Sequence, residues 1–303
     1  MGSVSSVVWG LSFKNAFLEK KGAAFEEWFV KLAGCAWQSD FETARAYGSE
    51  GDWKCDGRRV SKGKIFQCYA PESMNAQKMM AKITSDLEGA VEKWPNFIKG
   101  WVLVHNDTRG LPPQVLAHID SMRQRYPKVK IKTWAEPNLR KLFEQLTDQD
   151  KQEIFGQVPT MDTMQSITFR ELEPVIADLQ NREPDPRDDV PQPPSELKLD
   201  KNDLSLEARE FLQIGRFKAQ LVETYFNKSL TIELGERIAE AFRQKYNQLQ
   251  ALDLMPDQIL GELQKFAGFS GDPKRQAAAM AVLMYFFDRC DIFEDPDDEA
   301  VAS

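Results

Sequence analysis

Three side chains that suit the binding of a divalent cation lie within the first 70 residues of the chain. Asp56 stands in the turn-forming stretch GDWKCDG, Gln67 interrupts the apolar run KIFQCYA, and Glu26 belongs to the segment GAAFEEWFVKLAG. A buried polar side chain such as Gln67 costs roughly 1–3 kcal/mol unless it finds a partner, and a metal ion is one such partner. Because magnesium prefers oxygen ligands, the three side chains predict a metal site if they converge. Such a site suits phosphodiester cleavage, since the cation polarises the phosphate and lowers the pKa of the attacking water.

The elements around these residues alternate between helices and strands. Apolar spacing predicts a helix over 13–37 that Gly22 breaks into two, and Ser61-Lys62-Gly63 has the chemistry of a hairpin turn between two short strands. Further along, the patterns predict a helix over 75–94, a strand over 100–106, a helix over 111–126, a strand over 128–134 and a helix over 136–146. Because the strand over 100–106 is apolar throughout, the sheet is expected to be covered on both faces.

The second half of the chain reads as helical. A connecting helix is predicted over 161–179, followed over 181–203 by a linker rich in proline and charge. The run AAAMAVLMYFF is apolar nearly all round, which predicts a buried central helix. We therefore expect an α/β domain over 1–160, a connecting segment over 161–203 and an all-α domain over 204–303.

Charge is divided unevenly along the 303 residues, whose net charge is −8. Residues 1–160 hold 23 basic and 19 acidic residues, a balance of +4, and the remainder hold 16 and 28, a balance of −12. The first half is compatible with a polyanionic substrate, and the acidic half favours a protein partner. The four cysteines form no close CxxC pair and the chain has only two histidines, so a structural zinc site lacks partners. The cysteines instead fit the reduced thiols of a cytoplasmic protein.

Several classes of protein lack support in the sequence. No apolar run approaches the ~20 residues of a membrane span, and the first residues have no basic or long apolar region of a signal peptide. The motifs G-x-S-x-G, GxxxxGK[ST] and GxGxxG are absent, which removes the hydrolase, ATPase and Rossmann interpretations that depend on them. Two interpretations stay open for His105, a catalytic base after a strand and the start of a turn.

The segments that hold Glu26, Asp56 and Gln67 together resemble the PD-(D/E)xK nuclease superfamily, in its restriction-endonuclease-like Mrr branch. The resemblance implies a mixed sheet flanked by helices, with Asp56 as the metal-binding aspartate. Gln67 then takes the second acidic position and Glu26 is the helix glutamate. The ion would be Mg²⁺ or Mn²⁺, and Asp52 would be an outer carboxylate.

One position departs from that pattern. The resemblance implies a lysine two residues after Gln67, where this chain has Tyr69. Lys54 and Lys64 are the candidates for a displaced catalytic lysine, and the sequence does not choose between them. The alternative interpretation of Tyr69 is that it is a strand aromatic residue that packs in the core.

A second resemblance covers most of the chain. The stretch AVLMYFFDRCDIFEDP, with the helices around it, is similar to the C-terminal module of ABC-three-component proteins, of which the Lamassu defence system is an example. That resemblance implies an effector that works with an SMC-like ABC ATPase and a small middle subunit.

Together the two resemblances predict a cytoplasmic effector of an antiphage or anti-plasmid complex that cleaves DNA with a metal ion. The alternative is an inactive, nuclease-like adaptor that binds nucleic acid in the same kind of complex. A third interpretation is an unrelated α/β interaction protein. A homo-oligomer stays open, and no membrane partner is expected.

Overall fold

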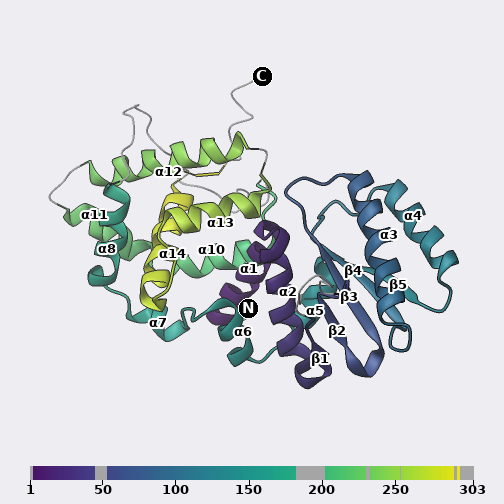
Figure 1. Ribbon diagram of the computed structural model, residues 1–303. Helices are drawn as coiled ribbons and strands as arrows, with labels where there is room; N and C mark the ends of the chain where they lie inside the picture. Colours follow the sequence, from purple (N-terminus) through teal and green to yellow (C-terminus); the bar gives the residue numbers. More distant parts are fainter. Residues whose placement is uncertain are drawn as a thin grey trace. The chain divides into compact units, whose positions relative to one another are not determined.

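The computed structural model describes residues 3–44, 53–181, 202–229, 233–252, 254–289 and 292–293 (Figure 1). The chain divides into two compact units. We call residues 16–154 the sheet unit, and residues 1–15 together with 155–303 the helical unit.

The sheet unit contains a mixed five-stranded sheet in the described residues, with strand order β1-β2-β3-β4-β5. The first three strands pair antiparallel, whereas β3, β4 and β5 run parallel. The predicted hairpin is confirmed: a 3₁₀ turn, η3 (Val60–Lys62), joins β2 to β3, and Gly63 follows it with a φ of 57°. The strands are β1 (Phe41–Glu42), β2 (Gly57–Arg59), β3 (Lys64–Tyr69), β4 (Gly100–His105) and β5 (Lys130–Trp134).

Helices cover both faces of this sheet, as the apolar strand over 100–106 predicted. On one face, Ile65 and Trp101 pack with Ile83 of α3 and Ile119 of α4. On the other face, the Phe66 ring packs against residues of α2, with the Phe29 ring 5.5 Å away, and α5 contacts both α2 and β5. All residues of β4 are buried. The helices that begin in this unit are α2 (Gly22–Trp37), α3 (Ala76–Lys93), α4 (Pro113–Arg125), α5 (Glu136–Phe143) and α6 (Asp148–Phe155).

Gly22 breaks the first helical segment, as predicted. Helix α1 (Val4–Glu19) ends before it and α2 begins at it. Gly22 has a φ of 49°, which favours glycine, and its N–H donates to the carbonyl of Ala70 at 2.7 Å. This bond ties the start of α2 to the chain just beyond β3.

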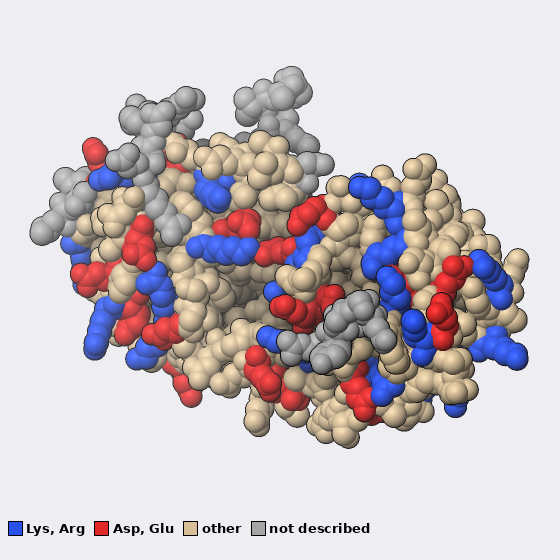
Figure 2. Space-filling model, viewed as in Figure 1, with Lys and Arg blue, Asp and Glu red and all other residues tan. Residues whose placement is uncertain are grey.

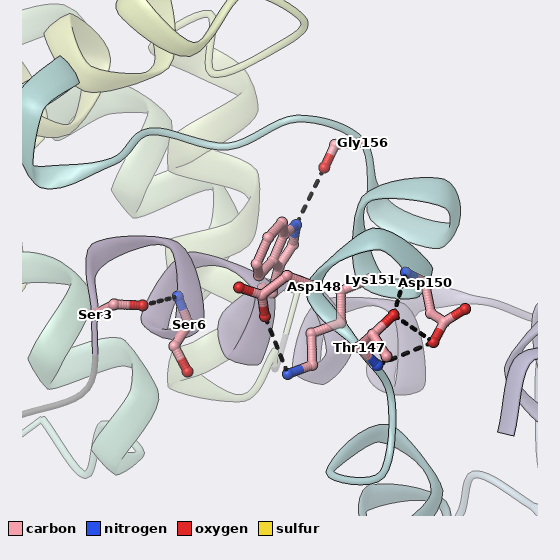
Figure 3. A network of polar contacts seen from close by, with 8 residues as sticks. Ser3, Ser6, Thr147, Asp148, Asp150, Lys151 and Gly156 are labelled. Atoms are coloured by element: carbon pink, nitrogen blue, oxygen red, sulfur yellow. Dashed lines mark hydrogen bonds and ion pairs between the residues drawn. The ribbon is translucent and has the colours of Figure 1, made fainter.

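Helix α1 begins nine residues earlier than the predicted helix and crosses the division between the units. Its first half belongs to the helical unit, where Val4, Val8 and Leu11 are buried. The Trp9 Nε1–H donates to the carbonyl of Gly156 at 3.1 Å (Figure 3). The two compact units meet in the sequence after residues 15 and 154, whereas the predicted domain boundary follows residue 160. The first residues of α1 are apolar on most sides of the helix, and Val7 and Trp9 are buried as well, so neighbouring elements cover them nearly all round.

Helix α14 (Pro273–Asp288) is the centre of the helical unit, and the prediction of a buried helix is confirmed. All residues from Gln276 to Phe287 are buried. At its closest approach to α10, a Cβ on Gly215 would lie 2.5 Å from the carbonyl oxygen of Met280. The other helices of this unit are α7 (Met161–Ser166), α8 (Phe169–Gln180), α10 (Leu206–Arg216), α11 (Ala219–Lys228), α12 (Leu234–Gln250) and α13 (Pro256–Phe266).

The predicted connecting helix over 161–179 is two helices, and the second is part of the core. Thr168 and Glu171 form a reciprocal capping box that starts α8 after the break. The apolar face of α8, which includes Leu172 and Ile176, is buried in the helical unit. The predicted linker lies for the most part, over 182–201, outside the described residues.

Candidate functional site

Asp56 is held against the middle of β3. Its backbone N–H donates to the carbonyl of Phe66 at 3.1 Å, which extends the hairpin by one residue. Its side chain is 4% exposed. One carboxylate oxygen accepts the Gln67 side-chain N–H at 2.9 Å, and the other accepts the Cys68 backbone N–H at 2.6 Å. These charge-assisted hydrogen bonds fix the orientation of the carboxylate.

Gln67 presents a buried acceptor with no hydrogen-bond partner in the described part of the chain. The residue is 5% exposed, and its amide nitrogen is used by Asp56. Its Oε1 atom is left without a partner among the described residues. A buried unsatisfied polar group costs about 1–3 kcal/mol. A divalent cation takes oxygen ligands, so the Gln67 Oε1 atom and the neighbouring Asp56 carboxylate suit the binding of such an ion.

Glu26 approaches the same strand from the other face of the sheet. Burial raises the pKa of the Cys68 thiol well above its usual range, and the charges of Asp56 and Glu26 raise it further. Cys68 follows Gln67, so the two side chains point to opposite faces. Gln67 points toward the face covered by α3, whereas Glu26 belongs to α2 on the opposite face. The structure thus joins Asp56 to Gln67 directly, and Glu26 as a ligand of the same ion stays a prediction.

The described residues contain no group of three or more His, Cys, Asp or Glu side chains arranged to hold a metal. Gln67 carries an amide and is not one of these four residue types. Asp52, the predicted outer carboxylate, lies outside the described residues. A cation here would therefore rest on the Asp56 carboxylate and the Gln67 amide oxygen.

The two candidate lysines lie in different surroundings. Lys54 forms an ion pair with Asp86 of α3 at 3.2 Å, and Trp53 and Lys54 have φ angles of 54° and 57°. Such left-handed conformations are costly for residues other than glycine. Lys64 begins β3, among the charges of other basic residues. The role of either as the displaced lysine stays a prediction.

Lys82 of α3 is a basic residue that the sequence analysis missed. Its Nζ lies 2.6 Å from an oxygen of Asp86, which is 2% exposed. Burial raises the pKa of the Tyr69 hydroxyl, and the charge of Lys82 opposes that shift. The same charge acts on Cys68. Lys82 thus brings a positive charge to the end of β3 where Tyr69 replaces the expected lysine.

A signal for this pair was present in the sequence. The apolar stripe of α3 includes Met79, Ile83 and Leu87, and Asp86 falls on that stripe. A carboxylate at a core position needs a cation, and a lysine four residues earlier is the nearest one on the same face. In Figure 2, Lys and Arg side chains follow α3 in a line over the sheet unit.

Lys82 is expected to stabilise the fold through Asp86. Replacing it, Lys82→Met, should lower the free energy of unfolding by about 1–2 kcal/mol, because a buried carboxylate loses one of two cations while Lys54 remains. The exposed Lys78, one turn earlier on α3, forms no ion pair in the described part of the chain and gives the matched variant Lys78→Met. Urea unfolding at neutral pH measures both, and equal stabilities of the two variants would contradict the assignment.

His105 ends β4 in register with Tyr69, and it is buried as a neutral imidazole. Burial lowers its pKa to about 4, against a smaller opposing effect of Asp107. Its Nδ1 accepts the backbone N–H of Asp107 at 3.3 Å. The next residue, Asn106, donates its side-chain N–H to the carbonyl of Lys20 at 2.9 Å. The pair therefore ends the strand and fastens it to the end of α1.

The buried histidine predicts a pH dependence of stability. Its pKa is lower in the folded than in the unfolded chain, so its contribution is full above about pH 6.5 and is lost as the pH falls toward 4. The loss amounts to about 3 kcal/mol at most. The variant His105→Gln should show a shallower decline in the free energy of unfolding over this window, in urea titrations at successive pH values. Parallel pH profiles of the variant and the natural chain would refute the prediction.

Part of the helical unit matches a known family of domains. Residues 170–294, which run from the start of α8 past the end of α14, match the model of a C-terminal domain of the ABC-three component (ABC-3C) systems. The particular model is that of C-terminal domain 10, CTD10. The match spans fewer than half of the 303 residues, and it shows that this region is similar to that C-terminal domain.

The chain matches no curated protein and no solved structure. The restriction-endonuclease-like form of the sheet unit therefore stays a prediction beside the observed mixed α/β fold. Among the described residues, no helix is both long enough and apolar enough to span a membrane.

Proposed function

We propose that this chain is an effector of an ABC-3C system in which the sheet unit is a Mg²⁺- or Mn²⁺-dependent DNA endonuclease, acting in the cytoplasm. An SMC-like ABC ATPase and a small middle subunit would control it through the CTD10-type region. The observation that carries the nuclease proposal is the buried Asp56–Gln67 pair, whose amide oxygen has no partner in the described residues.

The residues of the site have distinct tasks in this proposal. Asp56 and Gln67 would hold the cation, which when bound polarises a phosphate and makes its water more acidic. The Cys68 backbone N–H keeps the Asp56 carboxylate in place. Lys82 supplies positive charge near Tyr69, where developing negative charge on a phosphate would need it, and Asp86 positions that lysine.

Three observations favour the alternative, an inactive adaptor that binds nucleic acid. Tyr69 stands where the resemblance implies a lysine. Both oxygens of Asp56 already accept hydrogen bonds, and Lys82 is paired with Asp86. In the adaptor the same pair would serve only to hold the hairpin together.

Plasmid cleavage separates the two functions. The purified chain, free of partners, is incubated with supercoiled plasmid in Mg²⁺, in Mn²⁺ and in EDTA. An endonuclease converts the plasmid to open-circular or linear forms only with a metal. Intact plasmid under all conditions, together with DNA binding in EDTA, would support the adaptor and overturn the nuclease.

A further inference from the structure

A row of basic side chains crosses the sheet at the amino ends of its parallel strands. Arg59 of β2 pairs with Lys64 of β3, Lys64 pairs with Gly100 of β4, and Gly100 pairs with Lys130 of β5. Residues paired in this way place their side chains on the same face. Gly100 adds none, and a Cβ there would lie 3.3 Å from Lys64 Cγ. The side chain of Lys64 therefore lies over Gly100, between Arg59 and β5.

Two more lysines complete this set, which we call the basic row: Arg59, Lys62, Lys64, Lys130 and Lys132. Lys132 lies on the same face of β5 as Lys130, and Lys62 belongs to the turn before β3. Burial lowers the pKa of Lys64, and the charges of the other four members lower it further. The other four charges are thus each close enough to Lys64 to repel its ammonium group.

The basic row is poorly neutralised within the sheet unit. Arg59 bonds Asp40 at 2.7 Å, but the four lysines form no ion pair with any described carboxylate. Like charges placed opposite each other destabilise a sheet. Lysines that repel one another on one face, with no ion-pair partner among the described carboxylates, complement an anion from outside the unit.

Aromatic rings adjoin the basic row. Lys130, Lys132 and Trp134 alternate along one face of β5. The Trp134 ring lies 6.0 Å from the half-buried ring of Trp37, and the Arg59 guanidinium stands 4.8 Å above Trp37. Basic groups interleaved with flat rings are typical of surfaces that bind nucleic acid, because rings stack on bases while the charges meet phosphates.

We propose that the basic row binds the phosphate backbone of nucleic acid, at a surface separate from the Asp56–Gln67 pair. The row lies where β3, β4 and β5 begin, whereas Gln67 and Tyr69 lie toward the end of β3. Binding here needs no metal ion and no cleavage. It goes beyond the proposed function, since it holds equally for an endonuclease and for an adaptor.

The salt dependence of DNA binding tests this surface. A labelled DNA duplex is titrated with protein in EDTA, by fluorescence anisotropy, at several salt concentrations. The double variant Lys130→Gln, Lys132→Gln should bind about tenfold more weakly at low salt, and its slope of log K against log[salt] should be less steep by about 2, because each phosphate contact contributes about 0.9. Both side chains are exposed, so the fold should persist.

A matched control removes the same charge elsewhere. Lys141→Gln, Lys245→Gln changes two lysines that form no ion pair in the described residues, and it should bind within about twofold of the natural chain with an unchanged slope. If both double variants lose the same DNA affinity, the loss comes from the lower net charge of the chain and not from this surface, and the proposal is overturned. Binding of poly-glutamate as tight as that of DNA would also overturn it, in favour of an acidic protein partner. If the natural chain binds DNA in EDTA but does not cleave it in Mg²⁺ or Mn²⁺, the nuclease proposal fails while this surface stands, so the two failures are distinguishable.

Discussion

Asp56→Asn is expected to lower metal-dependent cleavage of plasmid DNA by more than ~100-fold. Replacing a residue that only hydrogen-bonds to a metal ligand already lowers metal affinity or activity by about 10–100-fold, and Asp56 would be a ligand itself. Asparagine has nearly the same shape, but it carries no charge to hold a cation beside the Gln67 oxygen. Its amide nitrogen must also face one of two donors, the Gln67 amide or the Cys68 N–H. We therefore expect the free energy of unfolding to fall as well, by about 1–3 kcal/mol.

The variant Gln67→Glu is the informative partner of this experiment. It restores the acidic residue that the nuclease resemblance implies, but it sets two buried carboxylates against each other and loses the donor to Asp56. Without metal, its melting temperature should fall below that of the natural chain. With Mg²⁺ or Mn²⁺, a larger recovery than in the natural chain is expected, because two carboxylates bind the ion more tightly.

Scanning calorimetry with and without metal measures these shifts, and initial rates of plasmid nicking measure the cleavage. If Asp56→Asn cleaves at the natural rate, the cation is not held by Asp56. If neither metal raises the melting temperature of the natural chain or of Gln67→Glu, the pair is structural and the adaptor is favoured.

Phe286→Ala should have the largest effect on the fold, a loss of about 3–5 kcal/mol in the free energy of unfolding of the helical unit. Phe286 is 0% exposed in α14, with the rings of Tyr285 and Phe242 each 5.1 Å away and that of Phe226 at 5.8 Å. Truncation leaves a cavity at the centre of the unit, where the surrounding helices cannot collapse fully.

The same residue type at the surface gives the control. Phe217 is 65% exposed just after α10, so Phe217→Ala should change stability by less than ~0.5 kcal/mol. Hydrogen exchange of the α14 amides, followed by mass spectrometry, reports on the helical unit separately from the sheet unit. Natural protection of α14 in Phe286→Ala would mean that this helix is not the core on which the unit depends.

Local chemistry made much of the fold predictable. The hairpin followed from Ser61-Lys62-Gly63, the break between two helices from Gly22, and the central helix from its lack of polar positions. Each of these signals acts within a few residues. The break that precedes α8 was missed because the capping box of Thr168 and Glu171 interrupts an apolar pattern that otherwise continues.

The candidate site was less predictable, because its details depend on contacts between distant segments. The sequence indicated Asp56 and Gln67, but only the pairing of β2 with β3 shows that the amide nitrogen is used and its oxygen is left. Lys82 was missed because its importance comes from Asp86 and from the place of Tyr69 across from α3. Glu26 and Gln67 likewise lie on opposite faces of the sheet because α2 covers one face and α3 covers the other.

Strand β5 is the last in its sheet and pairs on one side only within the described chain. The Arg123 guanidinium donates to its Ile131 carbonyl at 3.2 Å, and Lys130 and Lys132 flank that residue. Lysines on an open strand resist its pairing with the same strand of another molecule, because the charges would be brought together. These charges therefore disfavour the joining of two copies of this chain through β5, and we expect a homo-oligomer to form through a different surface.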